Sequence, residues 1–152
     1  LMEVPRNMNG VELDTHVRQP MREAGLKFKH GLAHGVGHVL SVHEGPNILR
    51  RIATPIEFKP GMIMSNEPGY YVDGEYGIRI ENEVLFVDKG NGDMRIQNIT
   101  FCPYEREAID KSLLTQEELD WINAYHDEVR TKLESLVHED AKEYLYEATK
   151  PL

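Results

Sequence analysis

The first apolar positions of the chain recur at the spacing of an α-helix. They are Val11, Leu13, Val17, Met21 and Ala24. Gly25 follows this run, and glycine is a favoured residue immediately after a helix. The pattern therefore predicts one helix over residues 12–25.

Between Lys27 and Val42 the pattern changes, because glycines alternate there with histidines and aliphatic residues. Each of Gly31, Gly35 and Gly37 would destabilise a helix interior by about 1 kcal/mol. We expect strand or loop in this segment, so that its histidines lie on an extended backbone.

Residues 62–66 and 78–87 show the alternation that is typical of strands. In the second segment one face is apolar and the other is mainly charged: Ile78, Ile80, Val84 and Phe86 against Arg79, Glu81, Glu83 and Leu85. Glu67-Pro68-Gly69 predicts a turn after the first segment. Asn91-Gly92-Asp93 predicts a turn into a further strand at 94–101, which makes 78–101 a hairpin.

The last third of the chain has helical spacing again. Thr115 followed by Gln116, Glu117 and Glu118 is typical of a helix start with a capping box. An apolar stripe then continues through residue 136, formed by Leu119, Ile122, Val129, Leu133 and Leu136. A second short helix is expected at 138–148, with Ala141, Tyr144, Leu145 and Ala148. We interpret both stripes as surfaces that pack against the rest of the chain.

Composition narrows the class of protein. A length of 152 residues with 40% hydrophobic content fits one globular domain, and no apolar run approaches the ~18 residues of a membrane span. The net charge of −9 argues against nucleic acid or an anionic membrane as a partner. Cys102 is the only cysteine, which excludes an intrachain disulfide and a thiolate cluster and fits a reducing, cytoplasmic location. We expect Cys102 to be a small core residue beside Phe101.

Four of the seven histidines fall within fourteen residues, at His30, His34, His38 and His43. Imidazole is the commonest metal ligand and exchanges protons near neutral pH, so this cluster indicates a metal site or an acid–base site. The competing interpretation is that some of the rings only satisfy buried hydrogen bonds. His38, which has apolar neighbours, is given that interpretation.

Two carboxylates downstream have unusual settings. Glu67 precedes Pro68-Gly69, and Glu81 lies in a strand whose other face is aliphatic. A solvated strand face with Arg79 and Glu83 explains Glu81 equally well. Taken together with the histidines, however, nitrogen and carboxylate ligands without thiolates suit Mn²⁺, Co²⁺ or Zn²⁺, and a carboxylate-rich site favours manganese.

At these residues the chain resembles the pita-bread metallopeptidases, which include aminopeptidase P, prolidase and methionine aminopeptidase. The likeness is greatest to the cytosolic eukaryotic type of Xaa-Pro aminopeptidase. It covers nearly the whole chain through an ordered set of motifs: His30-Gly31-x-x-His34-Gly35-Val36-Gly37, Val42-His43-Glu44-Gly45-Pro46, Pro60-Gly61-Met62, Asn66-Glu67-Pro68-Gly69-Tyr70-Tyr71, Gly77-Ile78-Arg79-Ile80-Glu81-Asn82 and Leu119-Asp120-Trp121-Ile122-Asn123.

The resemblance implies an α+β fold, the C-terminal half of a pita-bread fold with C-terminal helices. Residues 1–104 would be the C-terminal half of the catalytic domain and 105–152 its helical extension. The metal ligands would be His34, Glu67 and Glu81, with Glu81 bridging two divalent ions, and Mn²⁺ is the expected metal. Such paired ions activate a water for attack on the scissile carbonyl. Glu67 could take the proton of that water.

The same resemblance assigns the other pocket residues. His30 and His43 would orient substrate and carry protons, and Arg79 would brace Glu81. The reaction implied is removal of the N-terminal residue from peptides with proline in second position.

The chain departs from the family in one respect. The family's two remaining ligands are aspartates in an Asp-x10-Asp spacing before the first histidine, and this chain has no such pair, since Asp14 aligns with the helix that follows them. We therefore expect the chain alone to bind at most one ion, weakly, and to be inactive. A chain that begins with Leu1 also suggests a natural N-terminus upstream. A half domain leaves an open sheet edge, so we expect a homo-oligomer or pairing with the missing N-terminal segment.

Three alternatives remain at this point. The chain could be a non-catalytic pita-bread module that binds peptides or proteins, although such a module has no need to keep His34, His43, Glu67 and Glu81. A prolidase-type dipeptidase is compatible with the same motifs. A structural single-metal site lacks the closed four-ligand set of structural zinc.

Overall fold

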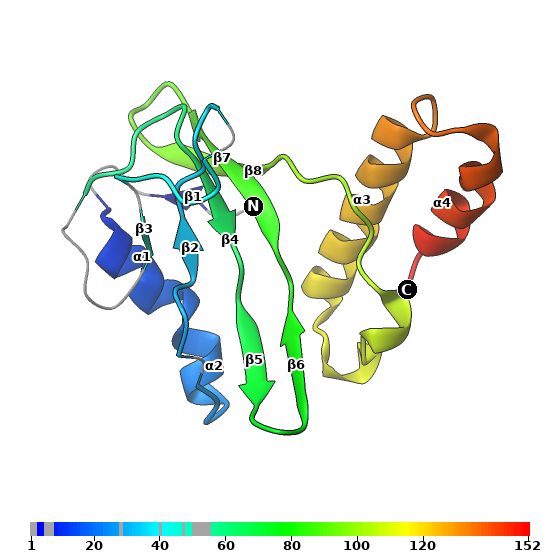
Figure 1. The fold of residues 1–152 in the computed structure, drawn as a ribbon, viewed down its shortest axis with the longest axis horizontal. Coiled ribbons are helices and arrows are strands. Elements are labelled where there is room, and N and C mark those ends of the chain that lie inside the picture. Colours follow the sequence, from blue (N-terminus) through cyan, green and yellow to red (C-terminus); the bar gives the residue numbers. More distant parts are fainter. Residues whose placement is uncertain (1–2, 5–7, 28, 40, 47, 50–55) are drawn as a thin grey trace. The chain divides into compact units, whose positions relative to one another are not determined.

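The computed structural model describes residues 3–4, 8–27, 29–39, 41–46, 48–49 and 56–152. The chain divides into two compact units, Leu1–Thr100 and Phe101–Leu152. The first unit combines helices with antiparallel strands and the second is helical (Figure 1). The prediction of an α+β fold is confirmed. In the described part of the chain, no helix has the length and apolar character needed to cross a membrane.

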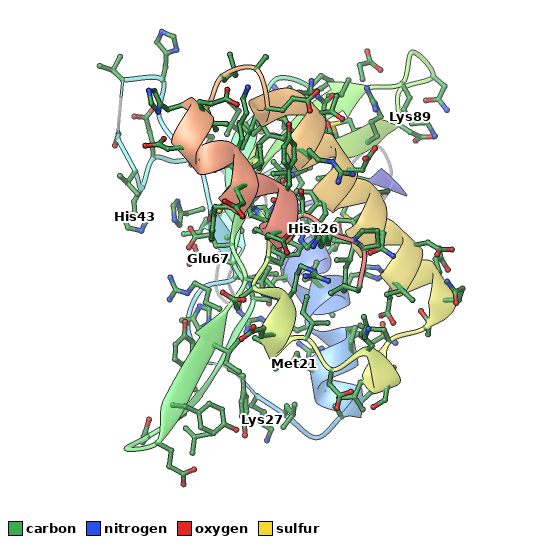
Figure 2. The ribbon with its side chains drawn as sticks, turned by 90° about the vertical axis from the view of Figure 1, so that its right-hand side faces the viewer. Met21, Lys27, His43, Glu67, Lys89 and His126 are labelled. Atoms are coloured by element: carbon green, nitrogen blue, oxygen red, sulfur yellow. The ribbon has the colours of Figure 1, made fainter. Side chains whose placement is uncertain are left out.

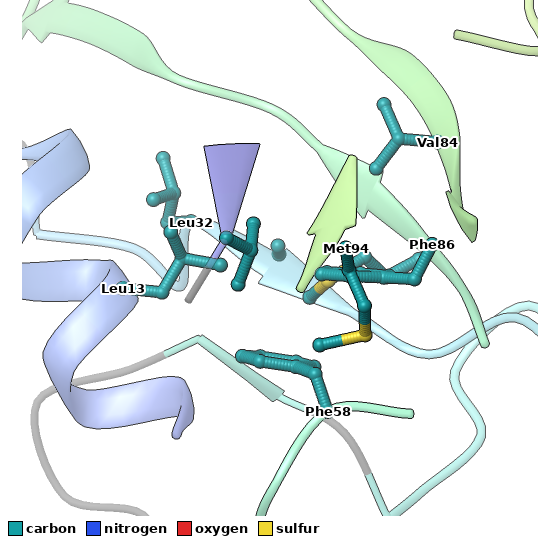
Figure 3. Packing of buried hydrophobic residues seen from close by; sticks show 9 residues of the cluster. Leu13, Leu32, Phe58, Val84, Phe86 and Met94 are labelled. Carbon is teal, nitrogen blue, oxygen red and sulfur yellow. The ribbon is translucent and has the colours of Figure 1, made fainter. Parts of the chain in front are cut away.

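A four-stranded antiparallel sheet organises the first unit. Its strand order is β1 (Glu3–Val4), β8 (Met94–Asn98), β7 (Asn82–Asp88) and β4 (Ile63–Asn66). Phe86 on β7 is 1% exposed, and its ring stacks on Phe58 at 4.7 Å between centroids and 6° between planes (Figure 3). Around this pair lies the core of the unit, formed by Val4, Leu13, Leu32, Ala33, Phe58, Met64, Val84, Phe86 and Met94.

The helix predicted over 12–25 is divided in the structure. α1 covers Gly10–Val17 and α2 covers Gln19–Glu23, with Arg18 between them. Pro20 explains the division, because proline has no N–H for the helical ladder and its ring collides with the carbonyl group one turn earlier. The expected end is found at Gly25, whose φ of 72° is the left-handed conformation that glycine adopts readily.

The strand predicted over 78–87 is also divided. β6 (Tyr76–Arg79) pairs with β5 (Gly69–Val72), whereas β7 pairs with β4, so the single-strand prediction is wrong at Ile80 and Glu81. The expected apolar face is divided as well. Val84 and Phe86 are buried, but Ile78 and Ile80 are 58% and 48% exposed.

The predicted turn at Glu67-Pro68-Gly69 is absent. Glu67 and Pro68 instead join β4 to β5, which extends with β6 away from the sheet as a long hairpin (Figure 1). Proline cannot donate a ladder hydrogen bond, which interrupts the pairing at this level. The register pairs Asn66 with Asn82 and Gly69 with Arg79. Glu67 and Glu81 therefore both lie at the interruption, on the two links that join β4 to β5 and β6 to β7.

The hairpin formed by β7 and β8 confirms the turn expected at Asn91-Gly92-Asp93. The hairpin needs left-handed backbone at this turn, and Gly92 supplies it with a φ of 93°. β8 ends at Asn98, three residues before the expected end at 101. The extended scaffold expected for 27–42 is confirmed where it is described, with a short strand β2 (Ala33–His34) that pairs with β3 (Ile48–Leu49); Phe28 and Leu40 lie outside the described residues.

The second unit consists of α3 (Gln116–Leu133), α4 (Lys142–Ala148) and three 3-10 turns, Arg106–Ala108, Lys111–Leu113 and Glu139–Ala141. The capping box predicted at Thr115 is confirmed, since Thr115 and Glu118 each accept a hydrogen bond from the other's backbone N–H. Tyr125, Val129 and Leu145 form its core.

Three predictions for this unit are wrong. Leu136 is 77% exposed because it follows the end of α3, and Tyr144 is 71% exposed because α4 turns the adjacent Leu145 inward. Cys102 is exposed. Cys102 contacts the second unit through its backbone and not through its side chain. Its carbonyl oxygen accepts a hydrogen bond from the Tyr125 hydroxyl at 2.6 Å.

His126 is fully buried in the second unit and accepts a hydrogen bond at Nε2 from the backbone N–H of Tyr104 at 3.1 Å. Burial lowers the pKa of His126, and the charge of Arg106 lowers it further, against a hydrogen bond to the backbone at Lys150 that raises it. A proton on Nε2 would also remove the acceptor of the Tyr104 bond.

We therefore expect the second unit to lose stability as the pH falls below about 6.5, the ordinary pKa of histidine. Above that pH both the folded and unfolded forms are neutral at this site. Below it the unfolded chain binds the proton first, so unfolding becomes more favourable until the pH passes the lowered pKa of the folded form. Urea unfolding followed by fluorescence of Trp121, the only tryptophan, measures this loss between pH 7 and 5.

Two variants provide the controls. His126→Gln keeps an acceptor for Tyr104 without a titrating ring and should flatten the pH dependence. His138→Asn, whose side chain is 84% exposed, should leave it as in the unchanged protein. Equal pH dependence in all three proteins would contradict the role given to His126.

Candidate metal centre

Backbone contacts between β2 and β4 bring His34 and Glu67 together. Gly35 forms a bridge with Met64 of β4, and the N–H of Glu67 donates to the carbonyl oxygen of Leu32 at 2.9 Å. As a result, Nε2 of His34 lies 3.2 Å from Oε1 of Glu67, and both side chains are largely shielded from solvent. Two residues that are far apart in sequence thus face one another.

Ser65 connects the same two residues and was not found from the sequence. Its hydroxyl accepts from the backbone N–H of His34 at 3.0 Å and donates to Oε1 of Glu67 at 3.0 Å, and the residue is 1% exposed. The available signal was positional, because residues two apart on a strand share a face and Ser65 precedes Glu67 by two. Serine as a residue type gave no indication.

Arg79 joins Glu67 to Glu81. Its Nη1 lies 3.1 Å from Oε2 of Glu67 and 3.7 Å from Oε2 of Glu81. Its Nε donates to the hydroxyl of Tyr71 at 2.7 Å. The hydrogen bond to Tyr71 raises the pKa of Arg79, and the two carboxylates raise it further. Arg79 therefore stays positively charged and balances two carboxylates.

His30 and His43 lie close to His34, Glu67 and Arg79. The ring of His43 is 4.1 Å from that of His34, and the ring of His30 meets Tyr71 edge-on at 5.4 Å. Both line a cavity of about 800 Å³ with His34, Glu67 and Arg79, and Figure 2 shows His43 and Glu67 near one another. His38 is exposed, so its interpretation as a buried, hydrogen-bonded ring is wrong.

The hydrogen bonds of His34 show that its Nε2 atom and the Glu67 carboxylate are suited to bind a cation. Nδ1 lies 3.0 Å from the carbonyl oxygen of Gly35, and because that oxygen only accepts, Nδ1 carries the hydrogen. Nε2 of a neutral ring then presents a lone pair to Oε1 of Glu67. Two acceptors this close require a proton or a cation, and a histidine whose Nδ1–H is held by a carbonyl is the usual form of a metal ligand.

The set of donors is incomplete for a closed site. Among the described residues, no group of three or more His, Cys, Asp or Glu side chains is arranged to hold a metal ion. His34 and Glu67 meet directly, whereas Glu81 is joined to them through Arg79 and its side chain is 46% exposed. The chain thus supplies two converging side chains, His34 and Glu67, a second carboxylate nearby at Glu81, and the guanidinium of Arg79 between the carboxylates.

Family models match most of the chain. The model described as metallopeptidase family M24 matches residues 2–88, and the model of the C-terminal region of peptidase M24 matches residues 94–152.

Sequence relatives include a probable Xaa-Pro aminopeptidase P of Coprinopsis cinerea, 44% identical over 97% of this chain and 26% of that protein. Aminopeptidase P1 of Arabidopsis thaliana is 39% identical over 97% of this chain and 24% of that protein. The chain thus spans about a quarter of the length of the curated relatives that it matches.

Solved structures agree with these matches. The X-prolyl aminopeptidase of Caenorhabditis elegans, described as a cytosolic enzyme with a di-nuclear active site, superposes with a TM-score of 0.89 at 36% identity over 99% of this chain and 26% of that chain. A prolidase of Pyrococcus furiosus superposes with a TM-score of 0.56 at 32% identity, over 68% of this chain and 28% of that chain. The fold is therefore the C-terminal part of the pita-bread fold followed by C-terminal helices.

Proposed function

Because this chain belongs to metallopeptidase family M24, we propose that it is the C-terminal part of a dinuclear-metal aminopeptidase that removes the N-terminal residue from peptides with proline in second position. Residues 1–104 form the second half of the catalytic domain and 105–152 its helical extension. Similarity to Xaa-Pro aminopeptidases along nearly the whole chain favours this specificity.

One observation carries the proposal. Nε2 of His34 lies 3.2 Å from a carboxylate oxygen of Glu67, on the wall of a cavity of about 800 Å³ that is also lined by two further histidines. A peptide-binding surface has no need for this arrangement, whereas a divalent cation stabilises it. His34, Glu67 and Glu81 are the ligands in this proposal.

The residues of the chain have distinct tasks in the reaction. A pair of divalent ions, when bound, supplies Lewis-acid polarisation of the scissile carbonyl and stabilises the charge that develops on its oxygen. Glu67 accepts a proton from the attacking water at Oε2 or Oε1, and Ser65 orients that carboxylate. His30 and His43 hold the peptide and carry protons at the cavity wall. Arg79 forms ion pairs with both carboxylates and compensates their negative charge.

The preferred ion in this proposal is Mn²⁺, because histidine and carboxylate donors without thiolates suit it. The two further ligands are aspartates of the segment upstream, so the chain alone binds at most one ion and does not cleave. Its substrates are proline-containing peptides in the cytoplasm. It also pairs either with the upstream segment or with a second copy of the protein.

Calorimetric titration of the chain with Mn²⁺ tests the proposed ligands. We expect weak binding of one ion, which His34→Ala abolishes because it removes the converging nitrogen. His38→Ala is the matched control, since it removes an exposed histidine of the same cluster and should leave the affinity unchanged. Equal affinity of the two variants would contradict the assignment.

Ser65→Ala should weaken Mn²⁺ binding roughly tenfold, because groups that orient a ligand contribute about 10–100-fold to metal affinity. The variant removes the hydroxyl that fixes Oε1 of Glu67 and leaves the His34 N–H without its acceptor. The same titration measures the change, with the exposed Ser41→Ala as the control. An unchanged dissociation constant would show that Ser65 does not support the ligand.

A further inference from the structure

A buried ion pair lies beside the cavity, outside the proposed set of ligands. Asp14 and Arg18 are 2% and 3% exposed. Nε of Arg18 donates to both carboxylate oxygens of Asp14, at 2.9 Å and 2.8 Å. Removing two charges from water is unfavourable unless each is neutralised and hydrogen-bonded, so this pair is held in a defined geometry.

The same guanidinium reaches the cavity wall. Nη2 of Arg18 donates to the backbone carbonyl oxygen of His30 at 2.9 Å, and both residues line the cavity. Arg18 thus links the end of α1 to the segment that leads into β2. A planar guanidinium can bind a carboxylate with one edge and a carbonyl oxygen with another, which an ammonium group cannot do in one fixed plane.

The carbonyl group that orients the His30 ring is the one that follows, along the backbone, the carbonyl group held by Arg18. Nδ1 of His30 lies 2.6 Å from the carbonyl oxygen of Gly31, and since this oxygen only accepts, Nδ1 carries the hydrogen. The ring meets Tyr71 at an interplanar angle of 83°. The tautomer and direction of the ring are therefore determined by the backbone at residues 30 and 31.

We propose that Arg18, held by Asp14, is a positioning residue that fixes the His30–Gly31 backbone and so keeps the His30 ring in one tautomer on the cavity wall. The inference rests on the proposed function only in that His30 contacts the peptide substrate. A purely structural role for the ion pair predicts a change of stability when it is altered, with the tautomer of His30 unchanged.

Three variants separate these roles. Arg18→Lys keeps a positive charge beside Asp14 but lacks the Nη2 group that donates to the His30 carbonyl oxygen. Asp14→Asn keeps an acceptor for Nε and leaves the bond from Nη2 to His30 in place. Asp14→Leu with Arg18→Met removes both charges, so that no unpaired charge is buried and the variant folds even where Arg18→Lys does not.

The experiment is long-range ¹H–¹⁵N correlation NMR of the histidine rings in the whole chain at about pH 8, above the ordinary pKa of histidine. We expect His30 to show one tautomer, with the hydrogen on Nδ1, in the unchanged chain and in Asp14→Asn. In Arg18→Lys, or in the double variant, the nitrogen shifts should move towards those of a free ring that populates both tautomers. A single Nδ1–H tautomer in all folded variants would overturn the proposal.

Binding of an Xaa-Pro peptide is measured on the same samples by calorimetry. We expect the dissociation constant to rise roughly tenfold in Arg18→Lys, as for the loss of one hydrogen bond to a charged group, and to stay the same in the control Ser41→Ala, which alters an exposed residue outside the cavity lining. If the tautomer changes in Arg18→Lys while the dissociation constant does not, the positioning role stands and the contact of His30 with the peptide, which belongs to the proposed function, fails. If peptide binds with an unchanged tautomer in every variant, the positioning role fails and the proposed function stands.

Discussion

Replacing Glu67 with glutamine is expected to reduce the affinity of the chain for Mn²⁺ by about a hundredfold or more. Glutamine keeps the size of the side chain and an acceptor for Ser65, but it removes the negative charge that faces Nε2 of His34 at 3.2 Å. Loss of a group that only supports a ligand typically costs about 10–100-fold in metal affinity, and loss of the ligand itself should cost more. Calorimetric titration measures the effect.

Glu83→Gln is the control for this variant. Glu83 is an exposed carboxylate on β7, close in sequence to Glu81, and its replacement changes the net charge by the same amount. We expect its affinity for Mn²⁺ to remain within about twofold, because an exposed charge at a distance is screened by solvent. Similar losses in both variants would mean that Mn²⁺ responds to overall charge and not to a site at Glu67.

Replacing Phe86 with alanine should have the largest effect on stability, lowering the free energy of unfolding of the first unit by about 3–5 kcal/mol. The ring is 1% exposed and stacks on Phe58, so its removal leaves a cavity between the sheet and the loop that carries Phe58. Single domains are typically stable by about 5–15 kcal/mol, and much of the margin would be lost. Trp121 reports on the second unit, so amide hydrogen exchange in β7 and β8 is the suitable measurement.

Ile78→Thr provides the comparison for Phe86→Ala. Ile78 is 58% exposed on β6, and threonine keeps the β-branched shape that suits a strand. We expect a change within about 0.5 kcal/mol. A loss as large as that of Phe86→Ala would show that β6 is buried against another surface in solution.

The periodic patterns correctly predicted those helices and strands that have a single buried face. The stripe around Val129 and the alternation of Val84 and Phe86 each correspond to a single buried face, and these elements are where the patterns placed them. The patterns failed where two parts of one apolar run pair with different strands. Ile78 and Ile80 continue the alternation of β7, but the backbone leaves β4 for β5 at that level, and no periodicity reveals a change of partner strand.

The sequence was sufficient to predict which residues form the candidate site, but not which of them contact one another. Histidines on a glycine-rich segment and the carboxylates at Glu67 and Glu81 could be found from the sequence. The link through Ser65 and the placement of Arg79 between two carboxylates depend on which strands are adjacent. The ion pair of Asp14 and Arg18 also lay outside any motif, because its partner in the cavity, the His30 carbonyl, belongs to the backbone.

The position of Arg79 explains how the two carboxylates beside it are compensated within the chain. Glu67 is buried, and an ionised carboxylate is unfavourable there unless a cation compensates it. Arg79 provides that charge at 3.1 Å and hydrogen-bonds to Tyr71, which places the guanidinium between the strands. The glycine opposite Tyr71, Gly77, leaves room for the tyrosine ring, since a Cβ atom there would collide with it.

If this chain supplies one half of a two-metal peptidase site, restoring the other half should produce an active enzyme. The measurement is release of the N-terminal residue from an Xaa-Pro peptide by the chain joined to the upstream segment of the Caenorhabditis elegans enzyme, in Mn²⁺. We expect the joined protein to cleave the peptide and its Glu67→Gln variant to lose that activity. A folded, manganese-loaded joined protein that releases nothing, or that cleaves equally well with Glu67→Gln, would contradict the account.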